Sequence, residues 1–407
     1  MFKLLFVSGV SACFELVNSE PYYSPEKYKV TVNGVEEDAE RDTNVFSLFN
    51  LKPDTEYTVT AGADGCKVTF VTEKETGVVS VKAFGAKGDG RTDDTPAVQG
   101  AIDACPKGGR VEVPEGTYLI RPLTLKSDIT VELKKGATLL GDTVEEHYPV
   151  IPARTVADGK EEITASWEGD PYDCRQALIY AYRQKNIRIV GEGFINGNAD
   201  NSTWWATPKG RKIARPRLVF LNKCENVTFH GVRTGNSASW NLHPFFSKNL
   251  AFYDIGVKCP ANAPNTDGLD PESCDNVRII GCKFSVGDDC CAIKSGKLYM
   301  GKTYKTPATR HTLRNNLFRD GHGAIVLGSE MSGGVKELTV GQCLFMNTDR
   351  GLRIKSRRGR GKDGIIDGVC FENIKMIGVK TPLVINMYYF CDPDGRSEFV
   401  WAHDKNI

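Results

Sequence analysis

The chain has 407 residues, of which 25% are charged, and its formal net charge is +1. This length suits a small module followed by a longer domain, so we expect two domains. The near-neutral balance argues against a surface for nucleic acid or for an anionic membrane, and no apolar run of about 18 residues indicates a membrane span. Any charge selectivity must therefore be local.

The chain contains 13 cysteines, an odd number in a protein much larger than disulfide-stapled secreted scaffolds. This usage predicts buried thiols in a reducing compartment. A zinc site is the alternative, but no CxxC pair occurs and the six histidines lack ligand spacing. We expect a bacterial cytoplasmic protein, with secretion as the alternative.

The N-terminus admits two interpretations. Met1–Ala12 followed by Cys13 resembles a lipoprotein signal, but its apolar stretch, Leu4–Val7, is short. We favour the other interpretation, in which Val7–Leu16 forms the first two strands of a β-sandwich, because cleavage at Cys13 would remove an edge that the small domain needs.

Residues 1–75 contain short alternating strands separated by turn residues, such as Lys27–Val32 and Val45–Phe49. The segment Leu51–Val59, with the sequence LKPDTEYTV, resembles the corresponding part of fibronectin type III domains, where the tyrosine packs at a corner between two strands. We therefore predict a fibronectin type III-like β-sandwich over residues 1–75, serving as a spacer or docking module.

After a polar boundary near Thr72–Gly77, one helix is predicted at Pro96–Ala104, where it can cap the domain that follows. Beyond residue 110, apolar strands recur with asparagines at the turns, and successive starts lie about two dozen residues apart. This period is not helical, so we predict an all-β fold with a right-handed parallel β-helix over residues 76–407, in which the asparagines stack in ladders. The predicted strands are Lys126–Leu133, Asn186–Ile195, Asn226–Val232, Asn249–Val257, Asn276–Phe284, Lys336–Phe345 and Val369–Ile377.

Four polar clusters are set in apolar, strand-like stretches within less than a quarter of the chain. Alternate side chains of a strand share a face, so Asn265 and Asp267 would point together, as would Arg353 and Lys355. Because the coils of a β-helix stack, clusters one repeat apart in sequence become neighbours in space. The clusters are Asn265-Thr266-Asp267, Gly287-Asp288-Asp289, Gly321-His322-Gly323 and Arg353-Ile354-Lys355.

Three close carboxyls cannot all be ionised cheaply, so crowding should raise the pKa of at least one, which can then donate a proton while the others act as bases. Carboxyls on neighbouring coils can reach the separation of about 6.5 to 9.5 Å that inverting glycosidases use. His322 would hydrogen-bond one carboxylate, and Arg353 and Lys355 suit an anionic sugar. Each cluster alone is commonly a solvated turn, a loop or a polar strand face. Their joint occurrence indicates hydrolysis of an acidic sugar chain.

In this order, the four clusters resemble the signature of glycoside hydrolase family 28, the polygalacturonases, over residues 78–390. The resemblance implies inverting hydrolysis of α-1,4-galacturonosyl linkages in polygalacturonan or its oligomers, without a cofactor or metal. The small domain ahead of the β-helix resembles bacterial exo-acting members. The implied roles are Asp288 as general acid, Asp267 and Asp289 as the residues that activate water, His322 as their support, and Asn265, Arg353 and Lys355 as substrate-binding residues.

Two alternatives stay open, a pectate lyase-type β-elimination and a non-catalytic carbohydrate-binding β-helix. The family continues for further coils after the Arg-Ile-Lys strand, so the chain is interpreted as truncated, with Cys391–Ile407 as loop. Oligomeric state is not predicted. Outside the catalytic set, Trp204 and Trp205 are candidates for stacking on a sugar or for packing. The remaining candidates for lining the groove are Trp240, Asn241, His243, Lys294 and Glu330.

Overall fold

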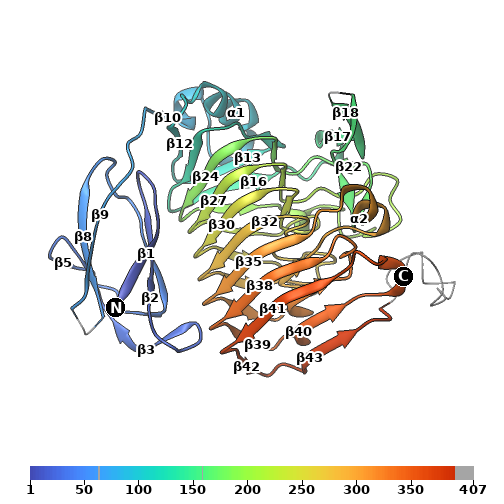
Figure 1. The fold of residues 1–407 in the computed structure, drawn as a ribbon. Coiled ribbons are helices and arrows are strands. Elements are labelled where there is room, and N and C mark those ends of the chain that lie inside the picture. The colour runs from blue at the N-terminus through green and yellow to red at the C-terminus, as the bar shows by residue number, and fades with distance from the viewer. Residues whose placement is uncertain (63–64, 158, 390–407) are drawn as a thin grey trace.

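The structure is a computed structural model that describes residues 1–62, 65–157 and 159–389. Parallel strands stack in coils along one axis to form a β-helix, and a separate group of antiparallel strands lies beside it (Figure 1). The predicted all-β parallel β-helix is confirmed. None of the described helices is long and apolar enough to cross a membrane.

Two ten-stranded parallel sheets form two sides of the β-helix. The first contains β10 (Val78–Ser80), β12 (Gly109–Val113), β15 (Ile129–Leu133), β24 (Lys185–Gly191), β27 (Glu225–His230), β30 (Lys248–Tyr253), β32 (Asp275–Ile280), β35 (Ala308–Arg314), β38 (Val335–Gly341) and β41 (Ile366–Glu372). The second contains β11 (Asp89–Asp93), β13 (Gly116–Ile120), β16 (Ala137–Gly141), β25 (Phe194–Asn196), β28 (Arg233–Gly235), β31 (Gly256–Lys258), β33 (Lys283–Ser285), β36 (Leu317–Arg319), β39 (Leu344–Met346) and β42 (Lys375–Ile377).

The third side is divided into two four-stranded sheets. Between them, the coil containing Leu269 and Glu272 forms bridges to Leu242 and Phe245 on one side and to Cys291 and Lys294 on the other. Backbone hydrogen bonds therefore continue the stack through this coil. The two sheets are β14 (Leu123–Thr124), β23 (Ile179–Tyr182), β26 (Val219–Asn222) and β29 (Leu242–Phe245), then β34 (Cys291–Ile293), β37 (Gly323–Gly328), β40 (Arg350–Lys355) and β43 (Thr381–Asn386).

Single predicted strands correspond to pairs of strands in different sheets. The predicted strand Asn249–Val257, for example, covers most of β30 and the start of β31, with the left-handed residue Asp254 between them. One residue at positive φ turns the chain sharply without interrupting the apolar pattern, so the sequence alone does not reveal the corner.

The predicted asparagine ladder is confirmed. Asn186, Asn226, Asn249 and Asn276 all have φ near +56°, a conformation that asparagine tolerates better than most residues. Each side-chain amide donates to the preceding asparagine, with Nδ2 to Oδ1 distances of 3.0, 3.1 and 2.8 Å along the series. The first member, Asn186, donates to Asp128. The ladder satisfies polar groups at one corner of successive coils.

Helix α1 (Thr95–Ala104) lies at the N-terminal end of the β-helix, as predicted (Figure 1). Its residues Val98, Ala101 and Ile102 are buried in the main core, so the helix covers apolar groups that the first coil would otherwise expose. A second helix, α2 (Leu298–Tyr304), was not predicted. Three short strand pairs precede β23, namely β17 (Val150–Ile151) with β22 (Cys174–Arg175), β18 (Arg154–Ala157) with β19 (Lys160–Ile163), and β20 (Ser166–Trp167) with β21 (Asp170–Pro171).

The antiparallel strands near the N-terminus form sheets with the orders β1-β2-β7 and β5-β4-β8-β9, and a separate pair, β3 and β6. The first strand is Phe2–Val7 and the second is Ala12–Leu16, so the prediction of two strands within Val7–Leu16 placed the first one too late. The strands are β1 (Phe2–Val7), β2 (Ala12–Leu16), β3 (Tyr23–Tyr28), β4 (Val30–Val32), β5 (Val35–Glu36), β6 (Arg41–Thr43), β7 (Val45–Leu48), β8 (Glu56–Ala61) and β9 (Lys67–Val71).

Buried polar contacts join these strands to the β-helix. The Glu15 carboxylate accepts hydrogen bonds from Arg314 Nε at 2.5 Å, Arg314 Nη2 at 2.7 Å and Asn315 Nδ2 at 2.7 Å. His230, fully buried, lies between the hydroxyls of Ser11 and Ser47, at 3.0 and 2.9 Å. Paired and hydrogen-bonded groups of this kind fix one orientation of the two parts.

Candidate active site

Only one of the four polar clusters lies within a strand. Arg353 and Lys355 belong to β40 and follow the predicted alternation. The prediction of a strand at Asn265-Thr266-Asp267 is wrong, because Asn265 has φ +56° and the segment lies in a turn. Asp288 and Asp289 lie in a bend outside the strands, and His322 lies in a bend directly before β37, which begins at Gly323. The direction of these side chains is therefore set by the turns of the chain and not by strand alternation.

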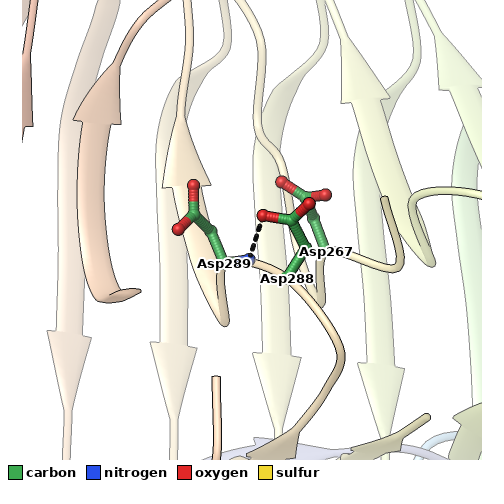
Figure 2. A group of neighbouring side chains, drawn as sticks. All are labelled: Asp267, Asp288 and Asp289. Atoms are coloured by element: carbon green, nitrogen blue, oxygen red, sulfur yellow. Dashed lines mark hydrogen bonds between the residues drawn. The ribbon is translucent and has the colours of Figure 1, made fainter. Parts of the chain in front are cut away.

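The three predicted aspartates nevertheless meet. One carboxylate oxygen from each of Asp267, Asp288 and Asp289 lies within 4.8 Å of the others. Figure 2 shows the three side chains grouped at neighbouring turns, with Asp289 N donating to Asp288 Oδ1 at 3.0 Å. This spacing is shorter than the expected 6.5 to 9.5 Å, which describes whole carboxyl groups on opposite sides of a sugar.

Thr266 joins the two turns that carry the aspartates. Its hydroxyl donates to Ala263 O at 2.9 Å and accepts from Gly287 N at 3.2 Å. A Cβ at Gly287 would lie 2.4 Å from Ala263 O, so only glycine allows this approach. Thr266 is buried, and both hydrogen bonds of its hydroxyl are to backbone atoms.

His322 contacts one carboxyl, as predicted, with its Nδ1 3.3 Å from Asp288 Oδ1. This hydrogen bond raises the pKa of His322. Burial disfavours ionised Asp288, but the His322 hydrogen bond and the Lys355 charge outweigh it, so the pKa of Asp288 lies below its ordinary value. In the free protein the proton of this pair therefore resides on the imidazole.

Lys355 and Arg353 converge on the third aspartate. Lys355 Nζ lies 2.8 Å from Asp289 Oδ2, and Arg353 Nη1 lies 3.6 Å from Asp289 Oδ1. Burial opposes the charge of Lys355, but Asp289 raises its pKa above the ordinary value. The cations predicted for substrate binding thus also neutralise a buried carboxylate.

The predicted effect of crowding falls on Asp267. Burial, followed by the charges of Asp270 and Asp288, raises the pKa of Asp267 well above its ordinary value, while Lys294 opposes the rise. Asp267 Oδ1 is buried without a hydrogen-bond partner among the described residues. The carboxyl with the elevated pKa is therefore not the one that the resemblance names as the acid.

A cavity of about 110 Å³ is lined by the three aspartates and Lys355, whereas His322 and Arg353 are not among its lining residues. Asn265 lines it too, as do Trp240, Lys294 and Glu330, which lie outside the predicted catalytic set. Its lining residues are Glu168, Lys209, Trp240, Asn265, Asp267, Asp288, Asp289, Lys294, Ser329, Glu330, Lys355 and Tyr389.

Sequence reasoning missed a second layer of charge behind the cavity. Asp270 and Glu272 are fully buried. Burial raises the pKa of Asp270 to about 7 and that of Glu272 to about 8. Glu272 Oε2 lies 3.0 Å from Nε2 of His243, and Arg217 stacks between Trp167 and Trp240. The available signal was the Asp-x-Glu alternation directly after Asp267, one coil before Lys294.

Trp204, Trp205 and Asn241 make contacts within the protein. Trp204 is buried and packs edge-on against Tyr148, with ring centroids 5.4 Å apart, which supports packing rather than sugar stacking. Trp205 Nε1 donates to Ser237 O at 3.1 Å. Asn241 is buried and donates to Asp267 O at 3.0 Å, so it holds the backbone of the aspartate.

One end of the third side is covered. Ile163 of β19, Phe220 of β26, Phe245 of β29 and Met300 of α2 form an apolar cluster separate from the main core. The strand pairs and α2 lie together beside the β-helix in Figure 1. Beside Asp267, the covering segments approach the cavity through a Glu168–Lys209 ion pair of 3.6 Å. The cavity is therefore bounded on the side of the early coils.

A parallel β-helix that brings three aspartates and two cations together fits the class of β-helical glycoside hydrolases. The family model for Glycosyl hydrolases family 28 matches residues 106–397, and the chain belongs to this family. It is 30% identical over 384 residues, 84% of its length, to the exo-poly-alpha-D-galacturonosidase of Dickeya chrysanthemi. The chain spans 61% and 62% of the length of two curated relatives that it matches.

Two solved structures are similar to most of the fold. The family 28 exopolygalacturonase of Yersinia enterocolitica matches with a TM-score of 0.72 at 23% identity, covering 94% of this chain and 87% of the other. The hyperthermoactive exopolygalacturonase of Thermotoga maritima matches with a TM-score of 0.63 at 31% identity, covering 76% and 75%. The fold is accordingly the right-handed parallel β-helix that the sequence predicted.

Proposed function

We propose that the chain hydrolyses α-1,4-galacturonosyl linkages in polygalacturonan or its oligomers. The observation that carries this proposal is the meeting of three carboxyls within 4.8 Å in a cavity that also holds a buried lysine. Family membership and relatives named as polygalacturonases support the same substrate. Acids for proton transfer beside cations for a uronate are what this reaction requires.

Asp288 with His322 is the acid in this proposal. Asp288 is the most exposed of the three aspartates and lines the cavity, and His322 is half exposed beside it. A bound sugar would remove water from Asp288, which favours its neutral form, and the imidazole proton could pass to it across the 3.3 Å contact. Asp288 would then donate this proton to the leaving oxygen.

Asp267 and Asp289 activate water in this proposal, and the reaction inverts the anomeric configuration. Both carboxylates are almost fully buried, and Lys355 occupies one oxygen of Asp289. Direct attack of either on a sugar carbon would need exposure that neither has. A water molecule between them is a smaller nucleophile with access to both.

Arg353 and Lys355 bind a galacturonate carboxylate in this proposal. The Arg353 guanidinium has donors beyond its contact with Asp289 and lies over the Tyr389 ring, 5.3 Å from the centroid. Asn265 serves as a hydrogen-bonding partner of the sugar on the opposite side, where its Oδ1 is held by Arg215 Nη2 at 2.7 Å.

Exo action is part of the proposal. The early coils are covered by the segments that carry Glu168 and Lys209, so a chain lying along the third side would end near Asp267. Cleavage beside a closed end releases short products from a chain terminus. The relatives named as exo-acting support this inference.

We further propose that residues 1–75 form a fibronectin type III-like domain and that the β-helical domain begins at residue 76; the loop expected at Cys391–Ile407 lies outside the described residues. The sheet orders β1-β2-β7 and β5-β4-β8-β9 support the sandwich, as does Tyr57 at the start of β8, whose hydroxyl accepts from Lys52 N at 2.9 Å. Cytoplasmic localisation is a proposal supported by the buried thiols of most of the described cysteines, among them Cys224, Cys282 and Cys343.

The purified protein should be incubated with polygalacturonic acid while reducing ends, absorbance of unsaturated uronates and product sizes are followed together. We expect reducing ends without the absorbance, and mono- or digalacturonate as the first products. Absorbance that disappears with a chelator would instead indicate calcium-assisted β-elimination, which the three clustered aspartates make the main alternative. Binding without any product would indicate a carbohydrate-binding β-helix.

A further inference from the structure

Each catalytic aspartate differs in how its charge is balanced. Asp288 contacts His322, and Asp289 contacts Lys355. Asp267 has no such direct contact among the described residues, and its Oδ1 is buried and unpartnered. Lys294 lines the same cavity, and its charge favours ionised Asp267, as do the charges of the buried Arg215 and Arg217. Lys294 therefore acts on Asp267 through its charge and not through a direct contact.

Lys294 is held firmly below the cavity. Its Nζ lies 2.9 Å from Glu330 Oε2, 3.8 Å from Asp270 Oδ2 and 4.5 Å from the centroid of the Trp240 ring. The side chain is almost fully buried. Lys294 directly follows β34 and bridges to Glu272, so it occupies the coil between Asp270 and the strand of Lys355. Because the carboxylates of Glu330 and Asp270 lie beside it, Lys294 can stay charged although it is buried.

Glu330 is the anchor of this arrangement. Besides Lys294, the charges of Arg360 and Lys355 act on Glu330, and together they hold its pKa below the ordinary value against the effect of burial. Glu330 thus stays ionised near two buried lysines. Lys355 contacts Asp289, and Lys294 contacts Glu330 itself. Its neighbour Ser329 donates to Glu330 Oε1 at 3.2 Å.

We propose that Lys294, anchored by Glu330, is a positioning residue that keeps Asp267 able to accept a proton from the attacking water. This inference rests on the proposed function. In the reaction, the water O–H bond breaks and its proton goes to Asp267. The oxygen bonds to the anomeric carbon as the glycosidic bond breaks, and the Asp288 proton goes to the leaving oxygen. Lys294 touches none of these atoms.

The need for Lys294 follows from the neighbours of Asp267. Asp270 is fully buried three residues later, with no hydrogen-bond partner for either oxygen among the described contacts, and Asp288 and Asp289 add further negative charge. Two buried carboxyls without a cation would each retain a proton, because an unpaired buried charge is costly. Asp267 could not then act as a base. The Lys294 ammonium, 3.8 Å from Asp270 Oδ2 and in the same cavity as Asp267, offsets the charge of one of the two carboxyls and so allows it to ionise.

The test compares K294M, which removes the charge, with K294R, which retains it, and with E330Q, which frees the ammonium from its anchor. The matched control is K283M, an exposed lysine of β33. We expect K294M to lower kcat/KM on oligogalacturonide at pH 5 at least tenfold, with its acidic limb displaced to higher pH by one unit or more and little change in KM.

The two charge changes should act in opposite directions. E330Q leaves Lys294 unneutralised, so its acidic limb should move to lower pH, while K294R and K283M should keep the limb of the parent protein. A double variant, K294M with E330Q, removes both charges and tests folding without a stranded partner. A uniform loss in K294M and E330Q with unmoved limbs would overturn the proposal, because it would assign Lys294 a structural role only.

A readout without turnover separates this inference from the proposed function. The Asp267 carboxyl can be followed by ¹³C NMR in protein labelled at aspartate, with D267N to identify its signal. We expect K294M to raise the apparent midpoint of this signal, even if the parent protein proves to have no hydrolytic activity. Hydrolysis by the parent with an unmoved midpoint in K294M would overturn the inference and leave the proposed function standing.

Discussion

Lys355 Nζ lies 2.8 Å from Asp289 Oδ2, although 66 residues separate the two in sequence. The contact arises because parallel register stacks β34, β37 and β40, with Gly328 directly paired to Lys355. Gly328 has φ +88°, and a Cβ there would lie 2.3 Å from Lys355 O, so glycine allows the two strands to approach closely. Lys355 therefore supports the catalytic carboxylate as well as facing the cavity.

This double contact predicts different kinetic effects for the two cations. K355M should lower kcat of polygalacturonate hydrolysis by about 100-fold or more, because it strands a buried Asp289 carboxylate whose role is proton transfer. R353K should mainly raise KM, because Arg353 is 3.6 Å from Asp289 and its fork is available to substrate. Steady-state kinetics on a defined oligogalacturonide would measure both.

A second comparison guards against misfolding as the cause. The double variant K355M/D289N removes both buried charges, so its thermal stability should be closer to that of the parent than the stability of K355M alone. If K355M raised KM without changing kcat, Lys355 would be a substrate-binding residue only.

The general-acid assignment predicts a large and specific loss. D288N should reduce kcat by at least about 100-fold at every pH, because the amide cannot donate a proton to the leaving oxygen. H322N should lower kcat less than D288N does. It should also change the alkaline limb of the pH profile, because it removes the imidazole whose pKa is raised by its hydrogen bond to Asp288. An activity of D288N within a few fold of the parent would refute the assignment.

The sequence predicted the coils and the four clusters better than it predicted the turns. Apolar periodicity and the asparagines are local signals, and the ladder from Asn186 to Asn276 follows directly from them. The sequence predicts a strand at Asn265, where the structure has a turn, because the apolar pattern does not show which residue adopts a left-handed conformation. The aspartates met because coil stacking depends on repeat length rather than on local conformation.

The charges behind the cavity show what periodicity cannot supply. Asp270 and Glu272 alternate like an exposed strand, yet both are fully buried, because the segments around α2 and the strand pairs cover this face. Those segments have no repeat, and nothing in their composition predicts where they fold back. The elevated pKa of Asp267 depends on these neighbours, so the sequence predicted crowding but not the residue on which it acts.

The buried Glu15–Arg314 contact predicts that the N-terminal strands contribute to the stability of the β-helix. E15Q should lower the free energy of unfolding by about 2 kcal/mol, less than for a fully buried ion pair because Arg314 is partly exposed. E225Q, which removes the solvent-exposed pair with Lys248, should change it by less than about 1 kcal/mol. Urea unfolding of both variants tests the difference, and equal effects would contradict it.

His230 predicts a distinct pH dependence of stability at the same interface. It packs between Phe6 and Phe49, with ring centroids 5.2 and 5.0 Å away. Ser47 donates its proton to Asp254, so His230 Nε2 donates to Ser47 and Nδ1 accepts from Ser11. Burial, with a smaller effect from Arg233, lowers the pKa of His230 to about 3.

Because the folded state holds this imidazole neutral while an unfolded histidine titrates near pH 6.5, the contribution of His230 is complete above that pH. It should fall by about 1.4 kcal/mol per pH unit as the pH decreases from 6.5 towards 3. H230Q, which cannot be protonated, should therefore cost about 2 kcal/mol less relative to the parent at pH 5 than at pH 7.5. Urea unfolding at both pH values measures this, with H147Q at a half-exposed histidine as the control. The same cost at both values would mean that His230 is protonated in the folded protein or is not confined by the interface.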